Sequence, residues 1–281
     1  MQLHKGTSGT KLAGVIGWPI WHSRSPRLHS WWLKRYGIDG AYVPLAVRPC
    51  HFSEVVRALG KAGFQGMNVT VPHKEAALTI VDEATPLARR IGAVNTIVCA
   101  DGGRLLGANT DSFGFTENLR ENRPDWRVCD GPVVVLGAGG AARAIVSALV
   151  DGGVQQLFLV NRSYQRAQTL AADIGGPIEI ISWSERAKIL AGASLLVNTT
   201  TLGMMNSQPL EIDLGALPET AVVMDAVYTP LKTHLLAIAA ERGNPIVDGI
   251  GMLLHQARPS FAAWFSLDPE VTAELRAFML E

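Results

Sequence analysis

The stretch PVVVLGAGGAARA at residues 132–144 decides the fold of the second half of this 281-residue chain. Residues 133–136 form a continuous apolar run, which is typical of a strand buried on both faces of a parallel sheet. Gly137, Gly139 and Ala142 follow with the spacing GxGxxA, and an apolar helix through residues 144–150 comes next. The pattern predicts a strand, a tight turn and a helix whose N-terminal amides can hold a pyrophosphate. Since such a motif alone is weak, an ordinary glycine-rich turn is the alternative.

A second apolar run, LFLV at residues 157–160, completes a βαβ unit, and SLLVN, AVVMD and PIVDG extend the parallel sheet. In NAD-binding units, an acidic residue at the end of the second strand accepts a hydrogen bond from the ribose 2′-hydroxyl. Here that strand ends in Asn161-Arg162-Ser163, with Arg166 one turn further and no carboxylate at the strand end. Two guanidinium groups and a hydroxyl suit a 2′-phosphate, so we expect a Rossmann-type, doubly wound domain that binds NADP(H). Two solvated arginines at a helix start are the alternative, although the helix dipole disfavours cations there.

The first 111 residues also alternate strand and helix signals and predict a separate α/β domain. Strands are expected near residues 12–16, 41–47 and 64–71, followed by a hairpin whose turn is 101–103. One helix is expected to begin at Pro26 with Ser25 as its N-cap, and another to open at Pro72. A third helix should bury Phe52, Val55, Val56 and Leu59, which recur at helical spacing.

The length of the chain exceeds that of most single cores, so two domains are expected. The last segment is helical in pattern and could pack on the first domain. We therefore expect one domain at residues 1–111 and 250–281, and a nucleotide-binding domain at residues 112–249.

Composition limits the classes of partner. The 25 basic residues balance the 25 acidic ones, and no basic run favours nucleic acid or a membrane surface, so a small-molecule substrate fits better. Three distant cysteines argue against a disulfide framework and a thiolate metal site. The seven histidines, His4 among them, show no metal-ligand spacing, so each is read as a surface or satisfied histidine and no metal is predicted. No segment reads as a signal peptide or membrane helix, so we expect a cytoplasmic protein.

Three polar segments of the first domain are SRSP at 23–26, NVTVPHK at 68–74, and NT at 95–96 followed by NTD at 109–111. Packed strands and helices do not need polar residues in these places. Lys74 stands in the first turn after Pro72, where the helix dipole disfavours a cation, and Asp111 begins a helix. Read without further context, Lys74 is a solvated lysine, and Asp111 and Ser25 are helix N-caps.

These and other segments, in this order, resemble the shikimate dehydrogenase family over nearly the whole chain. The matching segments are GWPIWHSRSP, GMNVTVPHKEAA, GAVNTIV, GANTDSFGF, VLGAGGAARA, VNRS with Arg166, NTTTLGM, DAVYTPLKTHLL and DGIGMLLHQA. The resemblance implies that the first domain, completed by the last helices, binds substrate, and that the middle domain binds NADP. It implies the reversible reduction of 3-dehydroshikimate to shikimate by NADPH, in the shikimate pathway of aromatic amino acid biosynthesis.

The resemblance also implies roles for individual residues. Lys74 and Asp111 would form the catalytic pair, because hydride delivery to a ketone leaves an alkoxide that needs a positioned proton donor. Substrate would be bound by Ser23, Ser25, Thr70, Asn95, Tyr228 and Gln256. The cofactor would be bound by Gly137, Ala138, Gly139, Gly140, Ala141, Asn161, Arg162, Ser163, Arg166, Thr199, Val227 and Gly249.

Three alternatives stay open at this point, and so does a homodimer. A quinate or dual quinate/shikimate dehydrogenase would share the pair but tends to carry an acidic residue for NAD and threonine in place of Ser25. A catalytically silent NADP-binding regulatory protein would not need both Lys74 and Asp111. A folate-interconverting dehydrogenase would want aromatic stacking instead of the serine pair. Thr199 departs from the family pattern, which often has alanine there.

Overall fold

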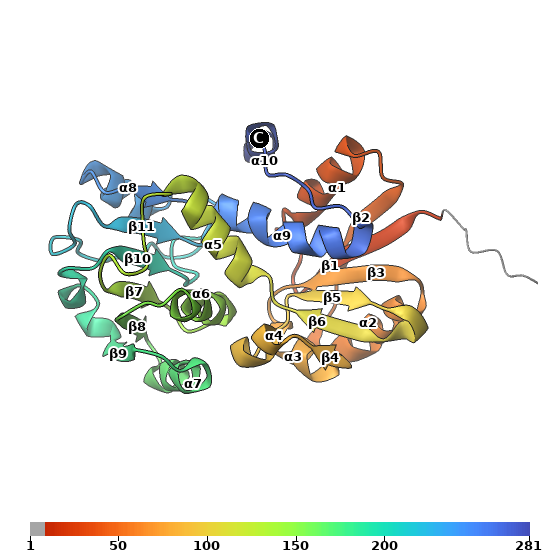
Figure 1. Cartoon of the computed structure of the whole chain (residues 1–281), viewed down its shortest axis with the longest axis horizontal. Helices are drawn as coiled ribbons and strands as arrows, with labels where there is room; N and C mark the ends of the chain where they lie inside the picture. The colour runs from red at the N-terminus through yellow and green to blue at the C-terminus, as the bar shows by residue number, and fades with distance from the viewer. Residues whose placement is uncertain (1–8) are drawn as a thin grey trace, which may run out of the picture. The chain divides into compact units, whose positions relative to one another are not determined.

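A computed structural model of the protein describes residues 9–281, which divide into two units (Figure 1). Unit 1 contains the described residues up to Arg89, together with Ala93–Thr110 and Ala257–Glu281. Unit 2 contains Arg90–Gly92 and Asp111–Gln256. Residues 250–256, assigned by the sequence to the first domain, thus cluster with unit 2. His4 lies outside the described residues.

Unit 1 is built on a six-stranded mixed sheet. Its strands are β1 (Lys11–Gly17), β2 (Gly40–Ala46), β3 (Phe64–Val69), β4 (Glu83–Ala84), β5 (Thr96–Cys99) and β6 (Leu105–Ala108), in the order β2-β1-β3-β5-β6-β4. β1 pairs parallel with β2 and β3, whereas β5 is antiparallel to β3 and β6. The carboxyl ends of β1, β3 and β6 and the start of β5 therefore meet at one edge of the sheet.

The helices of unit 1 bury the apolar faces that the sequence predicts. They are α1 (Ser25–Arg35), α2 (Phe52–Lys61), α3 (Lys74–Ile80), most of α4 (Pro86–Ile91), the second half of α9 (Gly249–Phe265) and α10 (Ala273–Leu280), with 3₁₀ turns at Pro49–His51 and Asp101–Gly103. Phe52 and Val56 of α2 lie in a core with Ile16 and Ile97, and Val55 and Leu59 pack against it. The predicted hairpin is present as β5 and β6.

Two predicted helix starts in unit 1 are wrong. Arg24, not Ser25, is the N-cap of α1, and Ser25 is the first helical residue. A serine hydroxyl does accept a main-chain hydrogen bond at this helix start, but the serine is Ser23: its hydroxyl accepts from the Ser25 amide at 3.3 Å. Pro72 precedes α3 and is not its first residue. It lies inside a turn that is closed by the His73 amide, which donates to the Thr70 carbonyl (2.9 Å), and α3 begins after this turn, at Lys74.

Unit 2 has the predicted doubly wound parallel sheet. Its strands are β7 (Val133–Leu136), β8 (Leu157–Asn161), β9 (Ile178–Ser182), β10 (Leu195–Asn198), β11 (Val222–Asp225) and β12 (Ile246–Val247), in the order β12-β11-β10-β7-β8-β9. The strand order reverses direction between β7 and β10. This is the switch point of a Rossmann-type sheet, where ligands bind at the carboxyl ends of the strands.

Helices cover both faces of this sheet. They are α5 (Asp111–Asn122), α6 (Gly140–Asp151), α7 (Tyr164–Ile174), α8 (His234–Glu241) and the start of α9, with 3₁₀ turns at Trp183–Glu185 and Lys188–Leu190. Alternation along β7 separates two cores: Val133 and Val135 pack with residues of α6, and Val134 and Leu136 pack with residues of α8. The edge strand β9, which the sequence did not predict, is only half buried.

Candidate functional site

The polar edge of unit 1 is held together by main-chain hydrogen bonds. The Thr70 amide donates to Ile16 at the end of β1 (2.9 Å), and the Val69 amide donates to the Asn95 carbonyl (2.8 Å). The Val94 amide donates to the carbonyl of Lys74 (2.9 Å), the first residue of α3. The end of β3, the start of α3 and the residues before β5 thus lie side by side. They carry three of the side chains that the sequence singles out, Thr70, Lys74 and Asn95.

A buried hydrogen-bond network supports this edge from below. The hydroxyl of Tyr42 is bonded to Ser25 and donates to Oδ1 of Asn68 at 2.7 Å. Asn68 Nδ2, which has two hydrogens to donate, lies 3.1–3.2 Å from three acceptors: the Asn95 carbonyl, Thr96 Oγ1 and Ser260 Oγ. Full burial raises the pKa of Tyr42 well above its ordinary value, so its hydroxyl stays protonated and can donate.

Asn95 extends the network to Thr110, which follows β6. Its Oδ1 accepts from the Thr110 amide (2.9 Å) and from Thr96 Oγ1 (3.0 Å), and its Nδ2 donates to Thr110 Oγ1 (3.0 Å). Thr110 directly precedes Asp111, the first residue of α5, which is almost fully buried. The sequence missed Asn68, Tyr42 and Ser260 as members of the site. Asn68 stands inside the quoted segment NVTVPHK, but no local pattern joins the other two to it.

The residue before Lys74 is fixed by packing. His73 is buried, stacks on Phe52 with ring centroids 4.4 Å apart, and lies 2.7 Å from the Val47 carbonyl through Nε2. Burial lowers the pKa of His73 below its ordinary value, and the hydrogen bond to the Val47 carbonyl offsets only part of this decrease. The imidazole is therefore a neutral donor at physiological pH and anchors the start of α3, from which Lys74 projects.

The nucleotide turn of unit 2 follows β7 as predicted. Gly137 has φ +111°, and a Cβ there would meet Thr199 Oγ1 at 2.4 Å, so the position requires glycine. A Cβ added at Gly139, the N-cap of α6, would meet nothing within 4 Å. Open space over the N-terminal amides of a twelve-residue helix fits a pyrophosphate.

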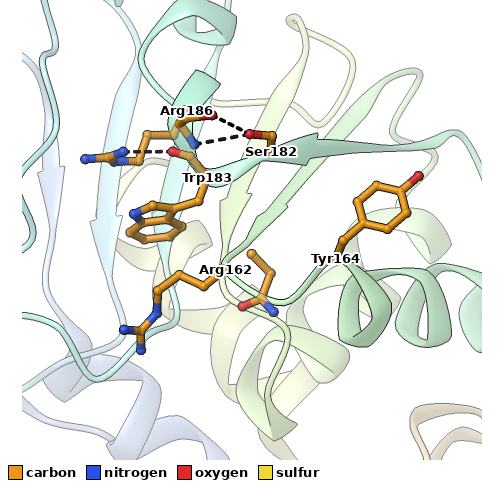
Figure 2. A pocket seen from close by; sticks show the side chains of 7 residues that line it. Arg162, Tyr164, Ser182, Trp183 and Arg186 are labelled. Carbon is orange, nitrogen blue, oxygen red and sulfur yellow. Dashed lines mark hydrogen bonds between the residues drawn. The ribbon is translucent and has the colours of Figure 1, made fainter.

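The end of β8 carries the residues expected to read the cofactor. Ser163 is the N-cap of α7 and accepts from the Arg166 amide at 3.4 Å, and Asn161 Nδ2 donates to the Ser163 carbonyl at 2.8 Å. Arg162 and Arg166 are exposed and form no ion pair within the described part of the chain. Figure 2 shows the adjoining cavity of about 680 Å³, lined by Asn161, Arg162, Tyr164, Ser182, Trp183, Ser184 and Arg186.

The carboxyl ends of β10 and β11 are joined by Asp225, which is fully buried. Its carboxylate accepts from Asn198 Nδ2 (2.9 Å), the Val227 amide (3.0 Å) and Thr233 Oγ1 (2.7 Å). Burial raises the pKa of Asp225, and these three hydrogen bonds act in the opposite direction. Thr199 donates to the Leu136 carbonyl at 2.6 Å and so ties β10 to the nucleotide turn.

Three further candidate residues lie in unit 2. Gly249 begins α9, and a Cβ there would meet the Ala226 carbonyl oxygen at 2.5 Å, so glycine is required by the backbone of the Val227 loop. Tyr228 follows in the same loop. Gln256 is largely buried and donates to the Leu253 carbonyl at 3.2 Å. Tyr228, Gln256 and Asp111 are thus grouped with unit 2, whereas Ser23, Ser25, Thr70, Lys74 and Asn95 are grouped with unit 1.

Among residues 9–281, no group of three or more His, Cys, Asp or Glu side chains is arranged to hold a metal ion. No helix in the same range is both long and apolar enough to cross a membrane.

Comparisons with known proteins agree with the geometry of both units. A family model described as the shikimate dehydrogenase substrate binding domain matches residues 15–97, and one described as shikimate / quinate 5-dehydrogenase matches residues 122–205. The NADP(+) shikimate dehydrogenase of Paramagnetospirillum magneticum is 62% identical over 270 residues, which are 96% of this chain and 98% of that protein.

Solved structures are similar over the same length. The shikimate 5-dehydrogenase of Thermus thermophilus, solved with NADP(H) and shikimate, has a TM-score of 0.84 and 34% identity, covering 96% of this chain and 97% of that one. The quinate dehydrogenase of Corynebacterium glutamicum, in complex with NAD, has a TM-score of 0.89 and 32% identity, covering 96% and 99%. The family models and the near full-length relative confirm the resemblance read from the sequence motifs, and this chain belongs to the shikimate dehydrogenase family.

Proposed function

We propose that this protein catalyses the reversible NADP-dependent reduction of 3-dehydroshikimate to shikimate. The observation that carries the proposal is the polar edge of unit 1, where Thr70, Lys74 and Asn95 are brought together over a buried hydrogen-bond network. A ring with several hydroxyls and a carboxylate needs many neutral hydrogen-bonding groups, and this edge consists mainly of hydroxyls and amides. The 62% identical relative carries the same activity in its name.

The substrate carboxylate is assigned to Ser23 and Ser25. Both stand at the N-terminus of α1, an eleven-residue helix without an acidic residue in its first turn, so the helix dipole favours an anion there. Thr70, Asn95, Tyr228 and Gln256 are assigned to the ring hydroxyls and the carboxylate. Since relatives that accept quinate tend to have threonine at the position of Ser25, serine favours shikimate.

Lys74 and Asp111 are assigned as the catalytic pair. When bound, the reduced nicotinamide supplies a hydride to the ketone carbon of the substrate. The Lys74 ammonium donates a proton to the oxygen on which negative charge develops. The Asp111 carboxylate orients that ammonium and accepts a hydrogen bond from a substrate hydroxyl. Lys74 is the first residue of α3 and Asp111 is the first residue of α5, so a helix start sets the backbone of each residue within its own unit.

The cofactor is assigned to unit 2, residues 112–249 in the sequence-based division, and the substrate domain to residues 1–111 and 250–281. Gly137, Ala138, Gly139, Gly140 and Ala141 would approach the pyrophosphate, and Asn161, Arg162, Ser163 and Arg166 the adenosine 2′-phosphate. Thr199, Val227 and Gly249 would line the path to the nicotinamide. The open space at Gly139 supports a dinucleotide, and Arg162 and Arg166, which form no ion pair among the described residues, support NADP over NAD. A biosynthetic reduction with NADPH suits the cytoplasm, where we expect the enzyme, and a homodimer is compatible with it.

The experiment that tests this assignment is the rate of NADPH-dependent reduction of 3-dehydroshikimate by the unmodified protein and by Lys74→Ala. We expect Lys74→Ala to lose about 10²- to 10⁴-fold in kcat, the usual range for a general acid, while its affinity for NADP is unchanged. Lys61→Ala is the matched control, because Lys61 is an exposed lysine at the end of α2. Near-normal turnover by Lys74→Ala would show that Lys74 is only a solvated lysine with no part in catalysis.

A further inference from the structure

We propose that Trp183 and Arg186, which follow the edge strand β9, extend the site for the 2′-phosphate and help to set the preference for NADP over NAD. The inference rests on the proposed function, in that the turn after β7 must bind a dinucleotide. It adds two residues that neither the GxGxxA motif nor the end of β8 indicates.

The position of Trp183 follows from strand register. β8 and β9 pair parallel with Asn161 opposite Ser182, so the residues that follow, Arg162 and Trp183, leave adjacent strands at the same edge of the sheet. Both line the cavity of about 680 Å³ at the carboxyl ends of β8 and β9. None of the residues that line this cavity is acidic, so nothing in its wall repels a phosphate.

Arg186 lies in the wall of the cavity and is bonded to neighbouring main-chain carbonyls. Its guanidinium carbon lies 4.9 Å from the centroid of the Trp183 ring, its Nη1 donates to the Trp183 carbonyl at 2.7 Å, and its Nη2 donates to the Glu211 carbonyl at 2.8 Å. These acceptors are neutral carbonyl oxygens. Glu211 and Asp213 line a second pocket with Arg186, but within residues 9–281 no carboxylate lies at ion-pair distance from it, so its positive charge is available to an anion in the cavity.

The indole of Trp183 lies between the two arginines. Figure 2 shows the ring with Arg186 on one side and Arg162 on the other, and all three side chains line the same cavity. An aromatic face attracts a guanidinium group and limits its freedom. Trp183 therefore limits the motion of Arg186, which adds its positive charge to that of Arg162 in the wall of the cavity. A ribose 2′-hydroxyl, as in NAD, gains nothing from either effect.

The test measures binding without turnover, by calorimetric titration with adenosine 2′,5′-bisphosphate and adenosine 5′-monophosphate. We expect Trp183→Ala and Arg186→Met each to weaken binding of the bisphosphate about three- to tenfold and to change binding of the monophosphate less than about twofold. Trp183→Phe keeps an aromatic face and should stay within about twofold of the unmodified protein. Lys188→Met is the matched control, because it removes the same charge from the next turn of chain at an exposed residue outside the cavity wall.

The outcomes separate this inference from the proposed function. Equal weakening of both nucleotides by Trp183→Ala would show that the indole supports the adenine or the fold, and an unchanged bisphosphate affinity would show that it does nothing there; either result overturns the inference. If Arg162→Met loses the preference while Trp183→Ala and Arg186→Met keep it, the inference fails and NADP binding stands. If the bisphosphate binds as expected but the protein does not reduce 3-dehydroshikimate, the proposed function fails and the inference stands.

Discussion

Replacing Asp225 with alanine should both destabilise unit 2 and weaken NADP binding. The buried carboxylate accepts hydrogen bonds from Asn198, the Val227 amide and Thr233, and these donors come from β10, the loop after β11 and the N-cap of α8. Each buried donor left without an acceptor costs about 1–3 kcal/mol. Removing a carboxylate whose charge is disfavoured by burial offsets part of that loss. We expect a net decrease of about 3–5 kcal/mol in the free energy of unfolding.

The same change should reach the cofactor site, because Asp225 fixes the loop that carries Val227 and ties Asn198 to it. We expect the Kd for NADP to rise about tenfold, equivalent to about 1.4 kcal/mol. Urea unfolding followed by circular dichroism measures the first effect, and calorimetric titration with NADP measures the second.

Asp213→Ala is the matched control for Asp225→Ala. Asp213 is also an aspartate of unit 2 that accepts a main-chain hydrogen bond, from the Gly215 amide at 2.8 Å, but it is exposed and the bond is local. Its loss should cost no more than about 1 kcal/mol. If the two variants unfold at the same urea concentration and bind NADP equally well, Asp225 does not hold the two strand ends together and our account of this region is wrong.

Two further perturbations have definite signs. Changing Arg162 and Arg166 together to methionine should reduce the NADP-over-NAD ratio of kcat/KM about 100-fold, since each exposed arginine is assigned about 1.5 kcal/mol toward the 2′-phosphate; an unchanged ratio would make both arginines merely solvated. Burial lowers the pKa of His29 from 6.5 to about 3, so between these pH values the unfolded chain binds a proton that the native protein does not. The free energy of unfolding is therefore unaffected by the titration of His29 above pH 6.5, and it decreases as the pH falls toward 3, by about 2 kcal/mol at pH 5. Urea midpoints at pH 7.5 and pH 5 should then differ less for His29→Leu than for the unmodified protein, and equal differences would contradict the predicted titration.

The parts of the fold that could be predicted from the sequence are those with a strong local signal. The run at β7 and the glycines after it predicted a strand, a turn and a helix start because these residues follow one another directly along the chain and Gly137 has a positive φ in the turn. The cofactor preference could also be predicted from the end of β8, since the absence of a carboxylate there favours NADP over NAD. β9 gave no such signal, because an edge strand is half exposed and its residues alternate less clearly.

The supporting residues of both sites could not be predicted because their contacts join distant segments. Tyr42 and Ser260 meet Asn68 across 26 and 192 residues of sequence, and no periodicity records such a meeting. Asp225 was visible only as the last residue of a strand, whereas its function depends on donors from two other elements. Ser25 was misread as a cap because serine before proline is a common N-cap pattern, and the choice between Ser23 and Ser25 depends on the backbone of the preceding turn.

Four initial rates test the assigned function most directly: shikimate and quinate are each offered with NADP and with NAD in one buffer. Lost hydrogen bonds of about 1.4 kcal/mol change kcat/KM tenfold, so we expect shikimate to exceed quinate by at least about tenfold and NADP to be strongly preferred over NAD. If quinate with NAD were used as efficiently as shikimate with NADP, the assignments of Ser25, Arg162 and Arg166 would be wrong, and the protein would act as a dual quinate/shikimate dehydrogenase.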